Sequence, residues 1–271
     1  MLGGKRLARH VLMAATEVHT MLSRVSIGCL MVSLTGCVAA TEDAAPEDEA
    51  AESSSAALYG YVFELGPGMA GANALLDALL DDVEVCTQGR CTTTSFGTYT
   101  LEGLQPHSQS EVSFRKAGYV FALVQASVGE KYGAAEAGLM SVAGARAFAE
   151  AAGASPLGQT GGLVVRLLEP GYGVFGALAG ANFAVQKAHG ARSIYADDRG
   201  LADAALKSTS SAGWGAAFGI APGMIGVAAF DEAGGRRCDS WSEQASELVE
   251  STQVQVHAGE LSFVTMLCLY L

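Results

Sequence analysis

The sequence predicts a mainly β protein in which two β-sandwich domains are joined by a helix rich in small residues. Short segments that alternate apolar and polar residues recur with glycine-rich turns about every eight to twelve residues, which is typical of sandwiches. In addition, residues 97–114 align without gaps on residues 213–230. The prediction also includes a disordered amino-terminal tether ahead of the first sandwich.

The composition excludes several classes of protein. Sixteen basic residues against 28 acidic ones give a net charge of −12, which would repel the phosphates of nucleic acid. Mean hydropathy is high at +0.28, but no run reaches the roughly 18 uninterrupted apolar residues of a membrane helix, which excludes a polytopic membrane protein. Five histidines leave little for a metal or catalytic cluster, so we expect no metal and no cofactor.

Residues 1–36 are predicted to be a signal region whose true start is Met21, although a long leader is the alternative. Arg24 provides a basic start, Val25–Leu34 form an apolar core, and small residues follow at a cleavage site. This core is too short to span a bilayer permanently.

The segment Leu34-Thr-Gly-Cys37 resembles the lipobox of bacterial lipoproteins. The resemblance implies that Cys37 is lipidated, becomes the mature amino terminus and anchors the chain to the membrane of the bacterial cell envelope. Val38 then favours the outer membrane. An ordinary signal peptide with a chance cysteine is the competing interpretation.

Residues 37–57 are expected to form a disordered acidic linker after the lipidated cysteine. From residue 39 onward the segment has no aromatic or branched apolar side chain, and its six acidic side chains repel one another. Such a segment buries too little surface to offset its conformational entropy. A calcium-binding acidic tail is the alternative.

Four cysteines remain after export, and an oxidising compartment favours disulfides. Cys86 and Cys91 flank a short turn in which Gly89 supplies a permissive backbone, so we expect them to pair with each other. Cys238 and Cys268 are then left to pair in the carboxy-terminal half. Zinc is the competing interpretation, but the ligand spacing is poor.

The folded part is predicted to comprise a first sandwich at 58–129, a helical connector at 130–159 and a second sandwich at 160–271. Alternation predicts strands that begin at Tyr59 and Gly161, and a final strand over Glu260–Leu271. Alanine-rich residues 133–153 have helical spacing, and Asn73–Asp81 suggest another helical turn.

An internal repeat relates the two predicted sandwiches. At a constant spacing, Gly97 falls on Gly213, Gly103 on Gly219, Leu104 on Ile220, Pro106 on Pro222 and Phe114 on Phe230. Earlier matches, such as Gly60 with Gly162, need a shorter spacing, so the loops of the two units differ in length.

Thr93–Leu104 and the later pair Gly118-Tyr119 resemble the carboxypeptidase regulatory-like domain, and residues around Gly213 resemble it more weakly. The resemblance implies tandem immunoglobulin-like or transthyretin-like sandwiches without catalytic residues of their own. Gly215 departs from the pattern because it stands where the first unit has Tyr99.

Several polar and aromatic residues were weighed as sites. His107, His189 and His257 are better interpreted as surface or turn residues than as ligands. Asp197–Asp203 offers oxygen ligands to calcium, but an ordinary turn explains this segment better. The residues that might line a carbohydrate-binding face, although packing is the simpler interpretation, are Tyr195, Trp214 and Trp241.

These observations predict a non-enzymatic lipoprotein whose two sandwiches serve binding, adhesion or envelope structure. The expected partners are the membrane, through Cys37, and a polysaccharide or envelope protein, with no nucleic acid. The alternatives are a carbohydrate-binding module protein and an exported hydrolase with an unrecognised active site. The ligand itself is not predicted.

Overall fold

A computed structural model describes residues 55–67, 78–155, 157–170, 175–231, 235–240 and 252–270. All of these belong to the compact unit Glu52–Leu271. The signal region, Cys37, the acidic linker as far as residue 54 and most of Asn73–Asp81 lie outside the described residues. The described residues are mainly strands with one helix, which confirms the predicted fold class.

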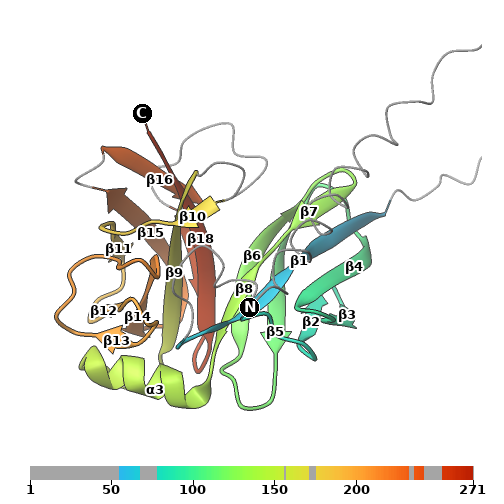
Figure 1. The fold of residues 1–271 in the computed structure, drawn as a ribbon. Coiled ribbons are helices and arrows are strands. Elements are labelled where there is room, and N and C mark those ends of the chain that lie inside the picture. Colours follow the sequence, from blue (N-terminus) through green and yellow to red (C-terminus); the bar gives the residue numbers. More distant parts are fainter. Residues whose placement is uncertain are drawn as a thin grey trace, which may run out of the picture. The chain divides into compact units, whose positions relative to one another are not determined.

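The first sandwich consists of two facing sheets (Figure 1). In one sheet β1 pairs antiparallel with β4 and parallel with β7 and β8. In the other, β2 pairs with β3 and β5, and β5 pairs with β6. The strands are β1 (Ala56–Leu65), β2 (Glu84–Thr87), β3 (Arg90–Thr93), β4 (Thr98–Leu104), β5 (Ser108–Arg115), β6 (Ala122–Val128), β7 (Tyr132–Ala134) and β8 (Ala137–Met140).

The core of the first sandwich follows from the alternation of its strands. Leu58 and Val62 of β1 point inward and are fully buried, as are Val112 and Phe114 of β5. The ring of Tyr99 meets that of Phe114 edge-on at 5.8 Å. Removal of these side chains from water is the main favourable term for this sandwich.

The helix α3 (Val142–Ala151) is shorter than the predicted helix over 133–153. Ser141 caps its first turn, because the Ser141 hydroxyl accepts a hydrogen bond from the backbone N–H of Gly144 at 3.1 Å. The preceding residues form β7 and β8 and give their backbone hydrogen bonds to β1. The expectation of helix before residue 141 was therefore wrong, because pairing with β1 outweighs the local propensity of alanine.

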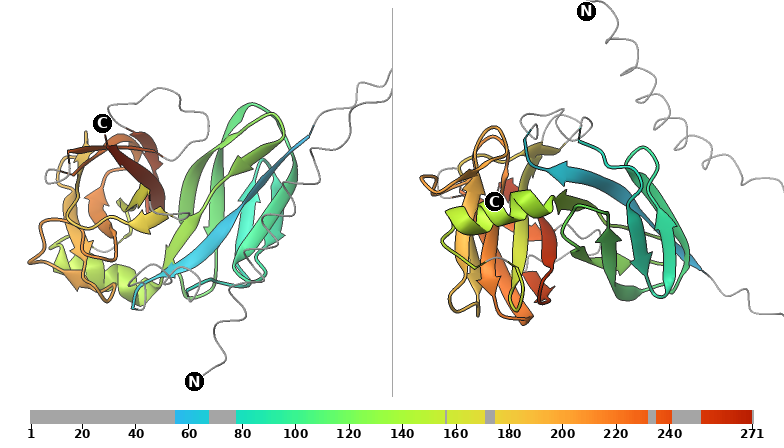
Figure 2. Two further views of the ribbon diagram at one scale, coloured as in Figure 1. Left: turned by 45° about the horizontal axis from the view of Figure 1, so that its top comes forward. Right: turned by 90° about the horizontal axis from the view of Figure 1, so that it is seen from below.

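The second sandwich is built on β9, which lies between β14, antiparallel to it, and β18, parallel to it. The facing sheet is centred on β15, which pairs with β11, β16 and β17. Its strands are β9 (Gly161–Pro170), β10 (Phe175–Ala177), β11 (Asn182–Gln186), β12 (Arg192–Ala196), β13 (Ala202–Asp203), β14 (Trp214–Ile220), β15 (Gly223–Asp231), β16 (Arg236–Ser240), β17 (Thr252–Val256) and β18 (Leu261–Tyr270). Figure 2 shows the two sets of strands, blue to green and yellow to red, as separate groups.

The pairing pattern repeats between the sandwiches. Gly97 and Gly213 precede β4 and β14 with φ of 67° and 69°, and Gly103 and Gly219 have φ of 75° and 76°. In both strand pairs the register shifts near the second glycine, which marks a β-bulge. The equivalence of β4 with β14 is therefore visible in the backbone.

The register corrects one part of the repeat alignment. Tyr61 pairs with Thr98, and Arg166 pairs with Trp214, the equivalent of Thr98. Tyr61 therefore corresponds to Arg166, a spacing of 105 (166 − 61). The alignment of Gly60 on Gly162 was three residues out of register.

Contacts between the two sandwiches combine backbone, apolar and charged groups. β6 and β18 pair in parallel at Leu261 and Ser262. The ring of Phe63 meets that of Phe263 edge-on at 5.8 Å. The guanidinium of Arg166 lies 5.0 Å from the centre of the Phe63 ring and 3.0 Å from a carboxylate oxygen of Glu136.

Candidate functional site

The Cys86–Cys91 disulfide closes a tight hairpin between β2 and β3, as predicted. The two cysteines lie directly opposite each other, and Gln88 and Gly89 form the turn with φ of 49° and 73°. Two consecutive positive φ values are typical of the type I′ turn that suits the twist of a hairpin.

The side chain of Gln88 explains why a non-glycine residue is tolerated at a positive φ. Its amide nitrogen donates to the hydroxyls of Ser108 and Ser110 at 2.9 and 2.6 Å, and its carbonyl oxygen accepts from the backbone N–H of Gln105 at 2.9 Å. These three bonds fasten the hairpin to the beginning of β5.

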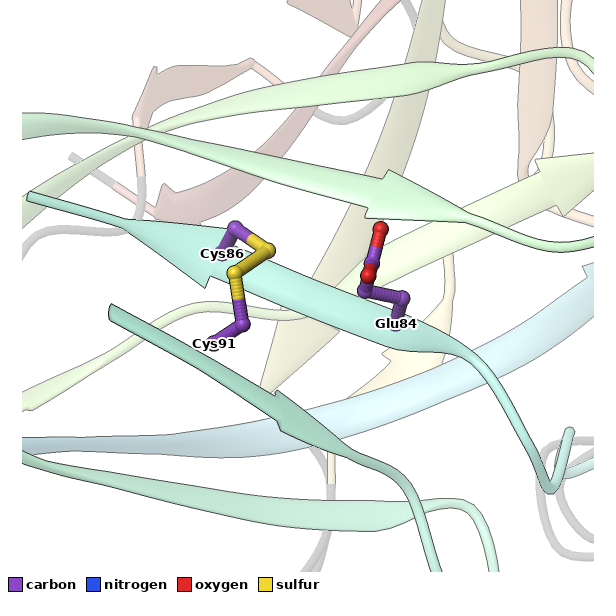
Figure 3. Close-up of side chains that lie close together, drawn as sticks. All are labelled: Glu84, Cys86 and Cys91. Carbon is purple, nitrogen blue, oxygen red and sulfur yellow. A yellow bond between two sulfur atoms is a disulfide. The ribbon is translucent and has the colours of Figure 1, made fainter. Parts of the chain in front are cut away.

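Glu84, Cys86 and Cys91 lie close enough together to suggest a metal site (Figure 3). The two sulfur atoms are bonded to each other, so neither is a thiolate that would bind zinc. One carboxylate remains, and a single exposed carboxylate is not a zinc site. This hairpin is therefore structural.

The Cys238–Cys268 disulfide is also formed as predicted, between β16 and β18. Cys268 is completely buried and Cys238 is 5% exposed, within the core of the second sandwich. The bond joins β16 to β18. In sequence these strands are separated by residues 241–260, of which 241–251 lie outside the described part.

The aromatic residues proposed as a carbohydrate face do not form one. Trp214 is fully buried and stacks on Phe148 of α3 at 4.9 Å, and Tyr195 is 7% exposed. The Tyr195 hydroxyl accepts a hydrogen bond from the backbone N–H of Phe183, and burial raises the pKa of Tyr195. Packing, the simpler interpretation from the sequence, is therefore confirmed for both residues, and Trp241 lies outside the described residues.

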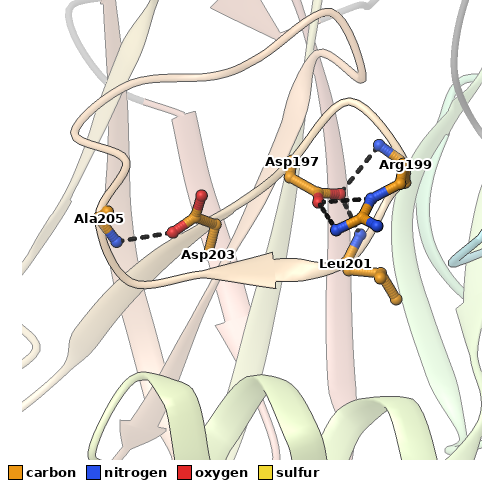
Figure 4. Close-up of polar contacts among 5 residues, drawn as sticks. All are labelled: Asp197, Arg199, Leu201, Asp203 and Ala205. Atoms are coloured by element: carbon orange, nitrogen blue, oxygen red, sulfur yellow. Dashed lines mark hydrogen bonds and ion pairs between the residues drawn. The ribbon is translucent and has the colours of Figure 1, made fainter.

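The carboxylates of Asp197 and Asp203 accept hydrogen bonds within their own turns (Figure 4). The carboxylate of Asp197 accepts hydrogen bonds from the backbone N–H groups of Arg199 and Leu201 at 2.9 and 2.8 Å, and it also binds the guanidinium of Arg199. The bond from Leu201 is the main reason that the pKa of Asp197 is lowered. Asp203 accepts from the backbone N–H of Ala205. These contacts favour the turn interpretation over calcium.

The three candidate histidines occupy loops, and none lies within a strand. His107 and His189 are exposed. Nε2 of His257 lies 2.9 Å from a carboxylate oxygen of Glu111 on β5. Burial raises the pKa of nearby Glu260, a shift that His257 reduces. This contact joins the residue that follows β17 to the middle of β5 at the surface, where such pairs contribute about 1 kcal/mol or less.

The half-buried carboxylate of Glu136 is neutralised by the second sandwich. One oxygen of Glu136 accepts from the guanidinium of Arg166 at 3.0 Å and from the hydroxyl of Thr265 at 2.6 Å. The same oxygen of Glu136 on the first sandwich therefore holds two side chains of the second. This cluster favours a structural role.

A shallow pocket of about 500 Å³ opens on the first sandwich. Its lining includes the acidic residues Asp82 and Glu84 and the basic residues Arg115 and Lys116. Arg115 lies over the ring of Phe121 at 4.6 Å, and the Lys116 ammonium donates to the backbone carbonyl of Asp81. Both basic groups of the pocket are thus already in contact with other parts of the protein.

Three of the exposed aromatic residues lie on the outer face of the sheet that contains β1 and β7. Tyr59, Tyr61 and Tyr132 are 42%, 47% and 64% exposed. We call these three residues the tyrosine face. Sequence analysis missed it because alternation identified the β1 strand without showing which of its faces is covered. The spacing of Tyr59 and Tyr61, two residues apart, was the available signal.

Comparisons with known proteins give no family for this chain. No protein-family model matches it, and no relative is found among curated proteins. Solved structures with similar folds include a minor pilin of Streptococcus agalactiae, at 14% identity and a TM-score of 0.28, covering 80% of this chain and 96% of the pilin. The shaft pilin of Lactobacillus rhamnosus has 10% identity and a TM-score of 0.24, covering 80% and 98%.

A third similar structure is a family 26 carbohydrate-binding module of Eubacterium rectale in complex with maltoheptaose. It has 12% identity and a TM-score of 0.25, covering 78% of this chain and 93% of the module. These TM-scores are too low for the likeness to carry an argument about function. No helix among the described residues has both the length and the apolar character needed to cross a bilayer.

Proposed function

We propose that this protein is a lipid-anchored component of the bacterial cell envelope that displays two β-sandwich modules for binding, without chemistry of its own. In this proposal residues 1–36 are removed as the signal region, Cys37 carries the lipid, and residues 37–57 tether the folded part. The sandwiches occupy 58–129 and 160–271 on either side of the connector 130–159, and the outer membrane is the proposed location.

The observation that carries this proposal is the pair of disulfides, Cys86–Cys91 and Cys238–Cys268. Stable disulfides belong to oxidising compartments outside the cytosol. This agrees with the basic start, apolar core and Leu34-Thr-Gly-Cys37 segment of the signal region. The resemblance to carboxypeptidase regulatory-like domains supports a display module without catalytic residues of its own.

The anchor is tested by metabolic labelling with a fatty acid in cells that express the full chain. The wild type is expected to incorporate label, and Cys37→Ser is expected to lose it. Cys29→Ser is the matched control, because Cys29 lies in the apolar core of the signal and should not be acylated. Equal labelling of the wild type and Cys37→Ser would refute the anchor.

A further inference from the structure

Strand register places the three members of the tyrosine face on one side of one sheet. Tyr59 and Tyr61 are two residues apart on β1, so their side chains point to the same side. Tyr132 on β7 lies opposite Ala57 in the parallel β1–β7 pair. Paired residues of adjacent strands share a face, so Tyr132 lies on the same side as Ala57, Tyr59 and Tyr61.

Hydroxyl groups border the rings on the other side of β1. Thr100 pairs with Tyr59 and Thr98 with Tyr61, across the antiparallel β1–β4 pair. Both threonines are exposed. The surface therefore combines flat aromatic rings with hydroxyl groups, and all five of these side chains are uncharged.

Phe63, the next residue on the same face of β1, shows which side chain occupies a position that the protein itself covers. Phe63 follows Tyr61 by two residues and is fully buried against Phe263 and Arg166. The covered position has no hydroxyl, whereas the exposed positions carry tyrosine, which combines an apolar ring with a hydroxyl group that forms hydrogen bonds. The open part is thus suited to a ligand that is itself partly polar.

The area of the tyrosine face is too small for a stable protein partner. With about 200 Å² for each tyrosine side chain, the exposed fractions of the three residues correspond to about 300 Å² in total. A standard protein–protein interface buries about 800 Å² on each partner. A few sugar rings, which stack their C–H faces on aromatic rings and exchange hydrogen bonds through their hydroxyls, match the smaller area.

We propose that the tyrosine face binds a neutral glycan chain, with the rings of Tyr59, Tyr61 and Tyr132 as stacking platforms. The ligand is neutral because the protein carries a net charge of −12, which repels acidic polysaccharides. This inference rests on the proposed function, since an exported binding protein meets polysaccharides of the envelope or its surroundings.

The test is electrophoresis of the full chain, purified in detergent, through gels that contain one soluble glycan each. The probes are amylopectin, a mixed-linkage β-glucan, glycol chitin and, as the acidic comparison, alginate. At least one of the three neutral or near-neutral glycans is expected to retard the wild type. The double variant Tyr61→Ala/Tyr132→Ala is expected to lose about tenfold or more in affinity, as removal of aromatic contact residues does elsewhere.

Two controls separate loss of binding from loss of folding. Tyr61→Phe/Tyr132→Phe keeps the rings and is expected to retain most of the affinity. Phe230→Ala removes an aromatic side chain of similar exposure, 46%, from the second sandwich and is expected to bind as the wild type does. An unchanged circular dichroism spectrum checks the fold of each variant.

The inference is overturned if none of the three probes other than alginate retards the wild type, or if alginate alone does. It is also overturned if the double alanine variant binds unchanged, or if Phe230→Ala loses affinity equally. These results are distinct from failure of the anchor. If the protein is labelled at Cys37 but binds none of the glycans, only the proposal of glycan binding is refuted. If it binds a glycan but is not labelled, only the proposal of a lipid anchor is refuted.

Discussion

Removal of the buried disulfide is expected to cost more stability than removal of the hairpin disulfide. The perturbations are the double variants Cys238→Ala/Cys268→Ala and Cys86→Ala/Cys91→Ala. The bridged residues are 30 and 5 positions apart, and the chain-entropy model gives about 3.6 and about 2 kcal/mol for these separations. Burial widens this difference in stability, because the sulfur atoms of Cys238 and Cys268 also fill space in the core of the second sandwich.

Urea unfolding followed by far-ultraviolet circular dichroism measures this difference. In a thermal scan the same losses correspond to a fall in Tm of about 7–14 °C for the buried pair and about 4–8 °C for the hairpin pair. Equal losses, or a larger loss for the hairpin variant, would refute the reasoning. Such a result would mean that residual structure in the unfolded chain, rather than loop length, determines the effect.

The two disulfides differ in exposure, so we also expect them to differ in how fast they are reduced. Cys91 is exposed, whereas Cys238 and Cys268 are buried. Mild reductant under native conditions, followed by alkylation and intact mass measurement, should label two cysteines of the mature chain before the other two. Peptide mapping should assign the first two labels to Cys86 and Cys91, and early labelling of the buried pair would contradict the structure.

Two further predictions concern the repeat and the pH dependence of stability. Gly97→Ala and Gly213→Ala should each lower the free energy of unfolding by at least about 1–2 kcal/mol, because both glycines have positive φ. An added Cβ would also lie within 2.6 Å of the Cβ of Leu79 or Ala177. Urea unfolding checks whether the two losses are similar. Burial raises the pKa of Glu260 above 4.5, so the folded state holds this proton more tightly and loses stability as the pH rises through that range. Glu260→Gln should therefore be more stable than the wild type at pH 7 and equal to it below about pH 4, which melting curves across this range would check.

The repeat was predictable because backbone positions with a positive φ favour glycine, and glycines are visible in the sequence. Glycine adopts this conformation at the least cost, so glycine is favoured at positions 97 and 213 of the two units. The strands before them carry no comparable mark. The spacing assigned to Gly60 was accordingly wrong by three residues, whereas the spacing between β4 and β14 was right.

Partners that lie far apart in sequence account for the other errors. Alanine-rich residues 133–140 were expected to be helical, but they pair in parallel with β1 and, at Gly133, with β6. Trp214 was considered for a sugar site because tryptophan often lines one, yet the ring of Phe148 covers it. The strand β1 lies far in sequence from residues 133–140, and α3 lies far from Trp214, so local patterns do not reveal these contacts.

The tyrosine face occurs where the two repeats differ most. By strand register, Tyr59 and Tyr61 correspond to Val164 and Arg166 of β9. Val164 is fully buried in the same cluster as Phe63, and Arg166 lies over the Phe63 ring. In the second sandwich this face is therefore used for contact with the first, so its side chains are fixed by packing. On β1 the same face carries Tyr59 and Tyr61 before Phe63, and these are 42% and 47% exposed. Exposed aromatic rings cost solubility unless they serve a partner.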